Sequence, residues 1–167
     1  MKTSFEGKII VLGDNIDTDQ ITPGRYVELV DPDEIGRHCL EGVDPAIAGS
    51  FPKGGIVVAG TNFGCGSSRE HAAIALISMG AAAVLADSFA RIFFRNAINL
   101  GLPLVVCPGI SGRVAQGQTL EVDLTAGAVR VKETGETFEC EKMGEQAFSI
   151  LEAGGIKPLM RKRLGLD

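Results

Sequence analysis

The sequence predicts an α/β fold that contains two kinds of sheet, a small parallel sheet flanked by helices and a second, mainly antiparallel sheet. Between residues 56 and 107, short apolar segments alternate with helical patterns, an order that favours parallel strands joined by right-handed crossovers. Between residues 119 and 140, apolar and polar residues alternate around turn residues, which is typical of antiparallel strands. A length of 167 residues suits one domain over residues 1–167.

The first strand is expected at Lys8–Leu12, an apolar segment that lies between two glycines. A polar loop follows over residues 13–20. Pro32 favours the start of a short helix at Asp33–Leu40, because proline suits the first turn of a helix. Residues 45–55 are rich in glycine, proline and small side chains, so they predict an exposed loop.

The middle of the chain predicts three strands and two helices in alternation. The strands are expected at Ile56–Ala59, Ala82–Ala86 and Leu104–Cys107, and the helices at Glu70–Met79 and Phe89–Leu100. Apolar side chains cover most of the second helix, so we expect it to be well buried, with Ser88 or Asp87 as its N-cap.

The last third of the chain predicts a small antiparallel sheet and a closing helix. The strands are expected at Thr119–Leu124, Ala128–Lys132 and Thr137–Cys140. A helix over Met143–Ala153 is expected to end at the glycine pair that follows it. The basic tail Lys157–Arg163 predicts a solvated last turn.

The composition excludes several classes of function. A net charge of −5 without a basic stripe argues against a nucleic-acid partner. No apolar segment is long enough for a membrane span. Because the chain begins without an apolar run and a cleavage site, we expect a cytoplasmic protein with reduced thiols. The cysteines form no CxxC pair and no metal-ligand spacing with either histidine, so no metal or cofactor is expected on this chain. They are Cys39, Cys65, Cys107 and Cys140.

The segment from Asn62 to His71 contains the most informative motif. It leaves one predicted parallel strand and enters a predicted helix, which is where ligands bind in open α/β sheets. Gly64 and Gly66 permit backbone conformations that other residues avoid. The unpaired amides at the start of the helix attract a carboxylate or a phosphate. The segment therefore predicts an anion-binding turn.

Three side chains of this turn can act on such an anion. Ser67 and Ser68 supply hydroxyl groups, and Arg69 supplies a guanidinium that binds a carboxylate through two hydrogen bonds. Amides and a guanidinium favour a charged serine alkoxide, which can remove a proton or attack an electrophile. The residues alone also allow a simpler interpretation, a tight turn capped by a serine. The spacings of phosphate-binding loops, dinucleotide folds and hydrolase nucleophile turns are absent from the sequence.

Residues 62–72 (NFGCGSSREHA) resemble the signature of the small subunits of isopropylmalate dehydratase and homoaconitase, which correspond to the swivelling C-terminal domain of aconitase. Residues 17–26 (DTDQITPGRY) and 87–103 (DSFARIFFRNAINLGLP) resemble the same family in the same order. With residues 151–155 (LEAGG), the match runs essentially end to end. Three long motifs in one order make this resemblance specific.

The resemblance implies a swivelling β/β/α domain that contributes to a hydro-lyase site. Ser67 would be the base that removes a proton in a trans elimination of water from a hydroxy-diacid, and the acid when water is added back. Arg69 would bind a substrate carboxylate with help from Ser68 and Gly66. Asp19 matches an acidic residue that borders the family's active site, although an aspartate in a turn also commonly caps its own loop.

The resemblance also assigns partners. A 4Fe-4S cluster is expected on a large partner subunit, where an iron would act as a Lewis acid toward the leaving hydroxyl. The expected partners of this chain are therefore that large subunit and a small hydroxy-diacid substrate. Cys65 and His71 are expected to pack around the turn, and Arg91 and Arg95 to serve the fold or the subunit interface.

The loop that separates substrates within the family corresponds to Arg25, Tyr26, Val27, Glu28 and Leu29. This segment matches neither the isopropylmalate pattern nor the homoaconitase pattern. Interconversion of 2- and 3-isopropylmalate in leucine biosynthesis is the leading interpretation. Homoaconitate, citraconate or citramalate, and dimethylmalate are alternative substrates, and a non-catalytic regulatory module that binds dicarboxylates is an alternative of a different class.

Overall fold

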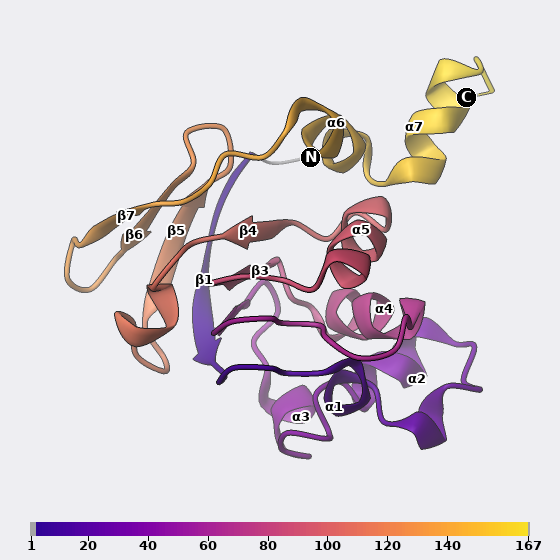
Figure 1. The fold of residues 1–167 in the computed structure, drawn as a ribbon, viewed down its shortest axis with the longest axis horizontal. Helices are drawn as coiled ribbons and strands as arrows, with labels where there is room; N and C mark the ends of the chain where they lie inside the picture. The colour runs from indigo at the N-terminus through magenta and orange to yellow at the C-terminus, as the bar shows by residue number, and fades with distance from the viewer. Residues whose placement is uncertain (1–2, 167) are drawn as a thin grey trace.

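The computed structural model describes residues 3–166, and its strands form one seven-stranded sheet in the order β4-β3-β2-β1-β5-β6-β7 (Figure 1). The strands are β1 (Ser4–Val11), β2 (Ile56–Ala59), β3 (Ala83–Ala86), β4 (Leu104–Val106), β5 (Thr119–Asp123), β6 (Ala128–Val131) and β7 (Thr137–Glu139). Strands β1 to β4 pair in parallel, and β5 to β7 join β1 by antiparallel pairing. The predicted fold class is confirmed. The predicted domain 1–167 also includes Met1, Lys2 and Asp167, which lie outside the described residues.

Strand β1 belongs to both parts of the sheet because its two ends pair with different strands. Residues 9–11 lie parallel to β2, and residues 4–8 lie antiparallel to β5. The strand therefore begins four residues before its predicted start at Lys8, in a stretch that is partly exposed and less apolar. The sheet also curls, since the chain after β7 returns to β4, where Glu141 N donates to Val106 O at 2.9 Å.

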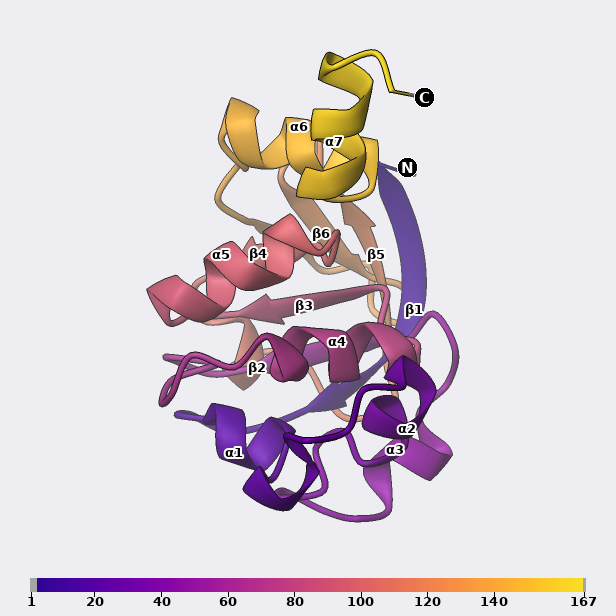
Figure 2. The ribbon, with the colours of Figure 1, turned by 90° about the vertical axis from the view of Figure 1, so that its right-hand side faces the viewer.

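The helices gather mainly on one face of the parallel strands, with α4 and α5 in front of β2 and β3 (Figure 2). They are α1 (Thr18–Ile21), α2 (Pro32–Arg37), α3 (Ile47–Ser50), α4 (Glu70–Met79), α5 (Arg91–Asn99), α6 (Glu145–Ala153) and α7 (Ile156–Arg163), with short 3-10 turns at Gly24–Tyr26 and Ile110–Gly112. No helix between residues 3 and 166 is both long and apolar enough to cross a membrane.

Two hydrophobic cores lie on opposite faces of the parallel strands. In β2, Val57 packs in the core beneath the helices, whereas Ile56 and Val58 pack in the core shared with the antiparallel strands. All residues of β2 and β3 are buried. Burial on both faces explains why these strands are unbroken apolar runs in the sequence.

Helix α5 differs from its prediction at its N-terminus. It begins at Arg91, two residues later than expected, and its N-cap is Ala90, which makes no side-chain capping bond. The predicted caps are therefore wrong. The Ser88 hydroxyl instead accepts a hydrogen bond from Asn62 N at 2.8 Å, so it supports the glycine-rich turn. Asp87 Oδ1 is buried and has no hydrogen-bond partner among the described residues.

The surface of α5 is also more open than its apolar composition predicts. Phe93, Ala97 and Ile98 are buried, but Ile92 is 57% exposed, so the prediction of a well-buried helix is wrong. No other element between residues 3 and 166 covers the Ile92 side chain fully. Ile92 lies on the side of α5 that borders the glycine-rich turn.

Two segments predicted as loops contain helices. The polar loop at 13–20 includes the start of α1, where Asp17 and Gln20 exchange hydrogen bonds in a capping box. The expected loop at 45–55 contains α3 and buries Phe51. The basic tail, expected as a solvated last turn, lies within the longer helix α7, none of whose residues is buried. Helix α2 ends at Arg37, three residues before its predicted end, and the remaining predicted elements lie within two residues of their expected bounds.

Candidate active site

The glycine-rich turn at residues 62–69 connects β2 to α4 at the carboxyl end of the parallel strands. Gly64 and Gly66 have φ angles of 85° and 98°, in the left-handed region that glycine tolerates best. A Cβ on Gly64 would overlap the ring of Phe93 on α5. The predicted need for glycine at both positions is confirmed, and at Gly64 close packing adds to it.

Main-chain hydrogen bonds fix this turn to the start of α1. Gly64 N donates to Ile16 O at 2.7 Å, and Thr18 N donates to Cys65 O at 2.8 Å. Two segments about fifty residues apart in the sequence therefore lie side by side, and the motif at 17–21 meets the motif at 62–72. The sequence alone gives no indication of this contact.

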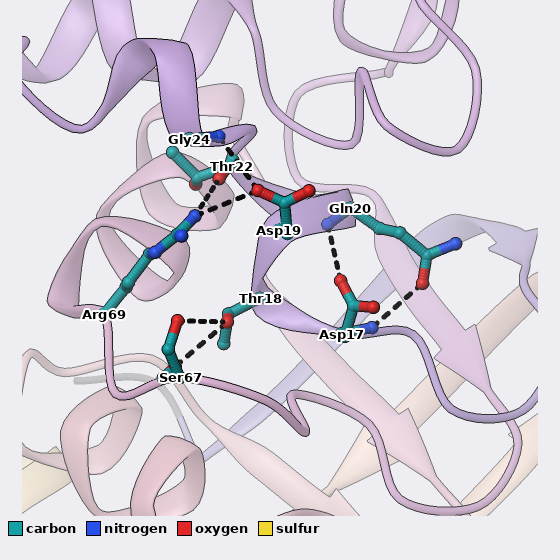
Figure 3. Close-up of polar contacts among 8 residues, drawn as sticks. All are labelled: Asp17, Thr18, Asp19, Gln20, Thr22, Gly24, Ser67 and Arg69. Atoms are coloured by element: carbon teal, nitrogen blue, oxygen red, sulfur yellow. Dashed lines mark hydrogen bonds and ion pairs between the residues drawn. The ribbon is translucent and has the colours of Figure 1, made fainter.

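The Ser67 side chain is exposed and lies beside the buried Thr18 (Figure 3). The Thr18 hydroxyl donates to Ser67 O at 2.9 Å and lies 3.5 Å from Ser67 Oγ. Thr18 is 2% exposed, so its hydroxyl is held in one place by packing. Sequence reasoning missed this residue, and its position between two aspartates of the first motif was the signal that could have found it.

Arg69 is oriented toward Asp19 across the same site (Figure 3). Its Nη1 donates to Asp19 Oδ1 at 3.2 Å and to Thr22 O at 3.0 Å. Asp19 Oδ1 also accepts from Gly24 N at 2.9 Å. Asp19 thus caps its own loop and also contacts Arg69. Its contacts fit both interpretations of this residue, as a loop cap and as a residue of the site. An exposed ion pair of this kind contributes about 0–1 kcal/mol, so it orients the guanidinium more than it stabilises the fold.

A cavity of about 210 Å³ opens between the glycine-rich turn and the N-terminal half of α5. It is lined by Thr18, Gly64, Gly66, Ser67, Ser68, Arg69, Ala90, Arg91, Ile92, Phe93 and Asn96. The amides of Ser67 and Ser68 donate to no acceptor within residues 3–166, and the start of α4 has no side-chain cap. Free amides, two hydroxyls and a guanidinium at one opening can bind an anion.

Four of the predicted substrate-binding and catalytic residues are therefore brought to one cavity: Gly66, Ser67, Ser68 and Arg69. Asp19 joins them through Arg69. Arg91, which we expected to serve the fold or an interface, also lines this cavity and is exposed. A hollow of similar size, about 230 Å³, lies beside β4, but aliphatic side chains dominate its lining and it contains no serine or arginine.

No residue of the predicted specificity loop at 25–29 lines this cavity, and the start of the loop is linked to it through Gly24 N, Asp19 and Arg69. Arg25 and Tyr26 point away to Glu41, whereas Val27 and Glu28 are exposed. Leu29 is half-buried and packs against the core. His71 Nε2 lies 3.0 Å from Leu29 O, so this histidine packs at the start of α4, as expected, and also holds the end of the loop.

The cysteines do not form a metal site among the described residues. Cys39, Cys107 and Cys140 are buried, and Cys65 is half-buried in the glycine-rich turn. Burial raises the pKa of the Cys39 thiol above its ordinary value, which opposes the thiolate form that a metal needs. No group of three or more histidine, cysteine or acidic side chains suited to a metal ion occurs between residues 3 and 166.

Comparisons with known proteins agree on one family. Residues 52–108 match the family model of the aconitase C-terminal domain. The chain is 52% identical over 162 residues to small subunit 1 of 3-isopropylmalate dehydratase from Methanopyrus kandleri, a match that covers 97% of this chain and 95% of that protein. The chain belongs to the 3-isopropylmalate dehydratase small-subunit family.

Two further comparisons concern Methanocaldococcus jannaschii. The small subunit of its isopropylmalate/citramalate isomerase is 45% identical over 164 residues, which cover 98% of each chain. A crystal structure of its 3-isopropylmalate dehydratase matches with a TM-score of 0.94 at 39% identity, covering 98% of this chain and 96% of that chain. The resemblance seen in the three motifs is therefore confirmed for the whole small-subunit fold, while the roles of individual residues stay predictions.

Proposed function

We propose that this chain is the small subunit of a hydro-lyase that interconverts 2-isopropylmalate and 3-isopropylmalate by dehydration and rehydration, a step of leucine biosynthesis. Membership of the small-subunit family supports this proposal. The observation that carries it is the exposed Ser67 hydroxyl, which lines one open cavity together with Arg69. The chain would act as one domain over residues 1–167, in the cytoplasm and together with a large subunit.

Ser67 is proposed as the group that moves the proton. As an alkoxide it would remove a proton from the substrate carbon next to the one that bears the hydroxyl, and as a hydroxyl it would return a proton during rehydration. The free amides of Ser67 and Ser68 and the guanidinium of Arg69 favour the charged form of the oxygen. Thr18 would keep Ser67 in place through its bond to the Ser67 carbonyl.

Arg69 is proposed to bind one substrate carboxylate, with Ser68 and the backbone at Gly66 completing the anion site. Its Nη1 is held by Asp19 and Thr22, and Asp19 is the more exposed of the ion pair, with 68% of its side chain accessible against 26% for Arg69. A guanidinium held by two acceptors loses little freedom when it binds a carboxylate. Arg91 at the other side of the cavity offers a second cation for a diacid.

We propose that a metal centre binds the departing hydroxyl, and residues 3–166 of this chain do not form one. The thiols are buried or isolated, and no cluster of ligands is present between residues 3 and 166. We therefore assign the expected 4Fe-4S cluster to the large subunit, where its iron would act as a Lewis acid toward that hydroxyl. The exposed side of the Ser67 cavity is the face at which the large subunit would meet this chain.

Citramalate is a second candidate substrate, because one relative is named as an isopropylmalate/citramalate isomerase small subunit. The two acids share a malate core and differ in their alkyl substituent. Val27 and Glu28 of the proposed specificity loop are exposed and would be free to contact such a substituent. Homoaconitate and dimethylmalate fit the same reaction and stay alternative substrates.

The test is reconstitution with a large subunit, followed by assays with isopropylmalate, citramalate, homoaconitate and dimethylmalate. The proposal predicts that this chain alone is inactive and that the complex has its highest kcat/KM with isopropylmalate. A complex that prefers another of these acids would move the assignment to that substrate. Activity of the chain alone, or binding of dicarboxylates without turnover in any complex, would refute the hydro-lyase role.

A further inference from the structure

The side chains of Arg25, Tyr26, His38 and Glu41 form a cluster that joins the loop after α1 to residues 38–41. Glu41 Oε1 accepts hydrogen bonds from Arg25 Nη2 at 2.5 Å and from the Tyr26 hydroxyl at 2.7 Å. Glu41 Oε2 lies 2.7 Å from His38 Nδ1. The rings of Tyr26 and His38 stack with their centroids 3.9 Å apart. Three neighbours therefore converge on one carboxylate, of which only 19% is exposed.

The charge of Glu41 is secured by these contacts. The hydrogen bond from Tyr26, followed by that from His38, lowers the pKa of Glu41 to about 2, so it is ionised throughout the physiological range. A carboxylate bound by three donors is a strong and directional acceptor. The cluster thus fixes the positions of Arg25 and Tyr26 relative to residue 41.

The main chain on either side of Glu41 is tied to α1. Leu40 N donates to Ile21 O at 2.8 Å, and Gly42 N donates to Gln20 O at 3.0 Å. Leu40 has a φ angle of 61°, which costs a residue other than glycine roughly 1–2 kcal/mol and persists only where the surroundings impose it. Leu40 is also fully buried. The main chain at residues 40–42 therefore holds Glu41 in a fixed position.

Residues 40–42 are connected to the acceptors of Arg69 in two ways. The acceptors of Arg69 are Asp19 on α1 and the carbonyl of Thr22 immediately after it. Residues 40–42 hold α1 through the main chain, and Glu41 holds the following turn through Arg25 and Tyr26. Gly24, in that turn, donates to the same Asp19 oxygen as Arg69, and a Cβ on Gly24 would lie 3.8 Å from Arg69 Nη2.

We propose that Glu41 is a positioning residue for Arg69: by fixing residues 24–26 against α1, it keeps Asp19 and Thr22 where they orient the guanidinium for a substrate carboxylate. The proposal rests on the proposed function, which assigns carboxylate binding to Arg69. Glu41 lies outside the motifs of the sequence and is not among the residues that line the Ser67 cavity. Its effect should therefore fall on substrate binding and leave proton transfer intact.

The first experiment measures kcat and KM of the reconstituted complex for Glu41→Ala and Glu41→Gln. For Glu41→Ala we expect KM to rise roughly tenfold while kcat changes less than about twofold, because loss of orientation weakens binding before it affects the proton-transfer step. Glu41→Gln, which keeps one acceptor oxygen, should give a smaller rise in KM. Glu121→Ala is the matched control, since Glu121 also accepts from an arginine, Arg130, but lies on the antiparallel part of the sheet.

A second measurement reports directly on the contact between Tyr26 and Glu41. Tyr26 is the only tyrosine of the chain, so labelling with 3-fluorotyrosine gives a single fluorine resonance. Both Glu41 variants should shift this resonance in the complex, and Glu121→Ala should leave it in place. Should Glu41→Ala fail to assemble, the same criteria apply to Glu41→Gln.

An unchanged KM in a Glu41 variant whose Tyr26 resonance has moved would overturn the positioning role. So would a loss confined to kcat, or a Tyr26 resonance that does not respond to Glu41. A wild-type complex that is inactive on every diacid would instead refute the proposed function, which is a different result from an active wild type with a normal Glu41→Ala variant.

Discussion

The glycine-rich turn at 62–69, which includes Arg69, and the loop at 24–29, which meets Arg69 through Asp19, are held in place by different means. Main-chain hydrogen bonds and two left-handed glycines fix the turn that carries Ser67. Side chains from another segment, above all Glu41, fix the loop. The left-handed glycines of the turn tolerate few substitutions, whereas a loop held by side chains can be altered by single substitutions of those side chains.

This contrast separates two tasks within one site. The proposed proton transfer would need the Ser67 oxygen in one position, which a rigid backbone would provide. The proposed discrimination among substituents would need a surface whose residues can vary while its anchor stays, which the loop would provide through the exposed residues Val27 and Glu28. Changes in the turn should therefore reduce the rate or the stability strongly, and changes behind the loop should have smaller effects.

The largest effect is expected from Ser67→Ala. Loss of the proposed base should lower kcat of the reconstituted complex roughly 10²–10⁴-fold with KM little changed, because general acid–base catalysis contributes on that scale. Steady-state kinetics with isopropylmalate measures this. Gel filtration with the large subunit is the control that assembly is intact. A variant that keeps near-normal kcat would remove Ser67 from the role of base.

Gly64→Ala should damage the same turn by a steric route. The left-handed φ of 85° costs roughly 1–2 kcal/mol for alanine, and the new methyl group would overlap Phe93, so the loss should exceed that figure. Urea unfolding of the chain measures the change in the free energy of unfolding. Gly49→Ala is the matched control, since its Cβ would have no neighbour within 4 Å and α3 needs no glycine there. Equal stability of the two variants would contradict the packing argument.

Thr18→Val should have a moderate effect on the rate. It removes the hydroxyl that bonds to the Ser67 carbonyl and keeps the shape of the buried side chain, so we expect kcat to fall roughly three- to tenfold, the value of one hydrogen bond. Thr18→Ser, which retains the hydroxyl, should recover most of the activity. If Thr18→Val and wild type have the same kcat, Thr18 supports only the fold.

The smallest effect is expected in how the contribution of Glu41 to the free energy of unfolding depends on pH. The pKa of Glu41 lies near 2 in the folded chain, below its ordinary value of 4.5, so its stabilising contribution is complete above pH 4.5 and is lost as pH falls toward 2. The difference in free energy of unfolding between wild type and Glu41→Gln should therefore be larger at pH 7 than at pH 2.5. Urea titrations at the two pH values measure it. An equal difference at both would contradict the lowered pKa.

The parallel part of the fold followed from the sequence because its elements are strongly patterned and bounded. Strand β2 and helix α4 lie at their predicted bounds, since an apolar run between glycines and a long helical pattern leave little choice. Helix α1 was missed because its four residues are mainly polar. It exists through the Asp17 capping box and the bond from Thr18 N to Cys65 O, which no local pattern shows.

The candidate site also contains residues that a local pattern identifies and residues that only the fold identifies. Gly64, Gly66, Ser67, Ser68 and Arg69 follow one another in the chain, so a motif could identify them. The acceptors of Arg69 and the support of Glu41 depend on contacts between residues 15 to 50 positions apart, which only the folded chain brings together. The surface of α5 was mispredicted for a related reason, because an apolar sequence does not show which side chains find neighbours in the fold, and Ile92 stays exposed.

Competition between wild type and Ser67→Ala for the large subunit tests the central claim most directly. If the chain supplies the proton-transfer group of a shared site, an equal amount of Ser67→Ala, added when the large subunit is limiting, should reduce the rate of isopropylmalate turnover to about half, by mass action. A rate that stays constant or rises would contradict the account, because the variant would then either not occupy the wild-type position or work without Ser67.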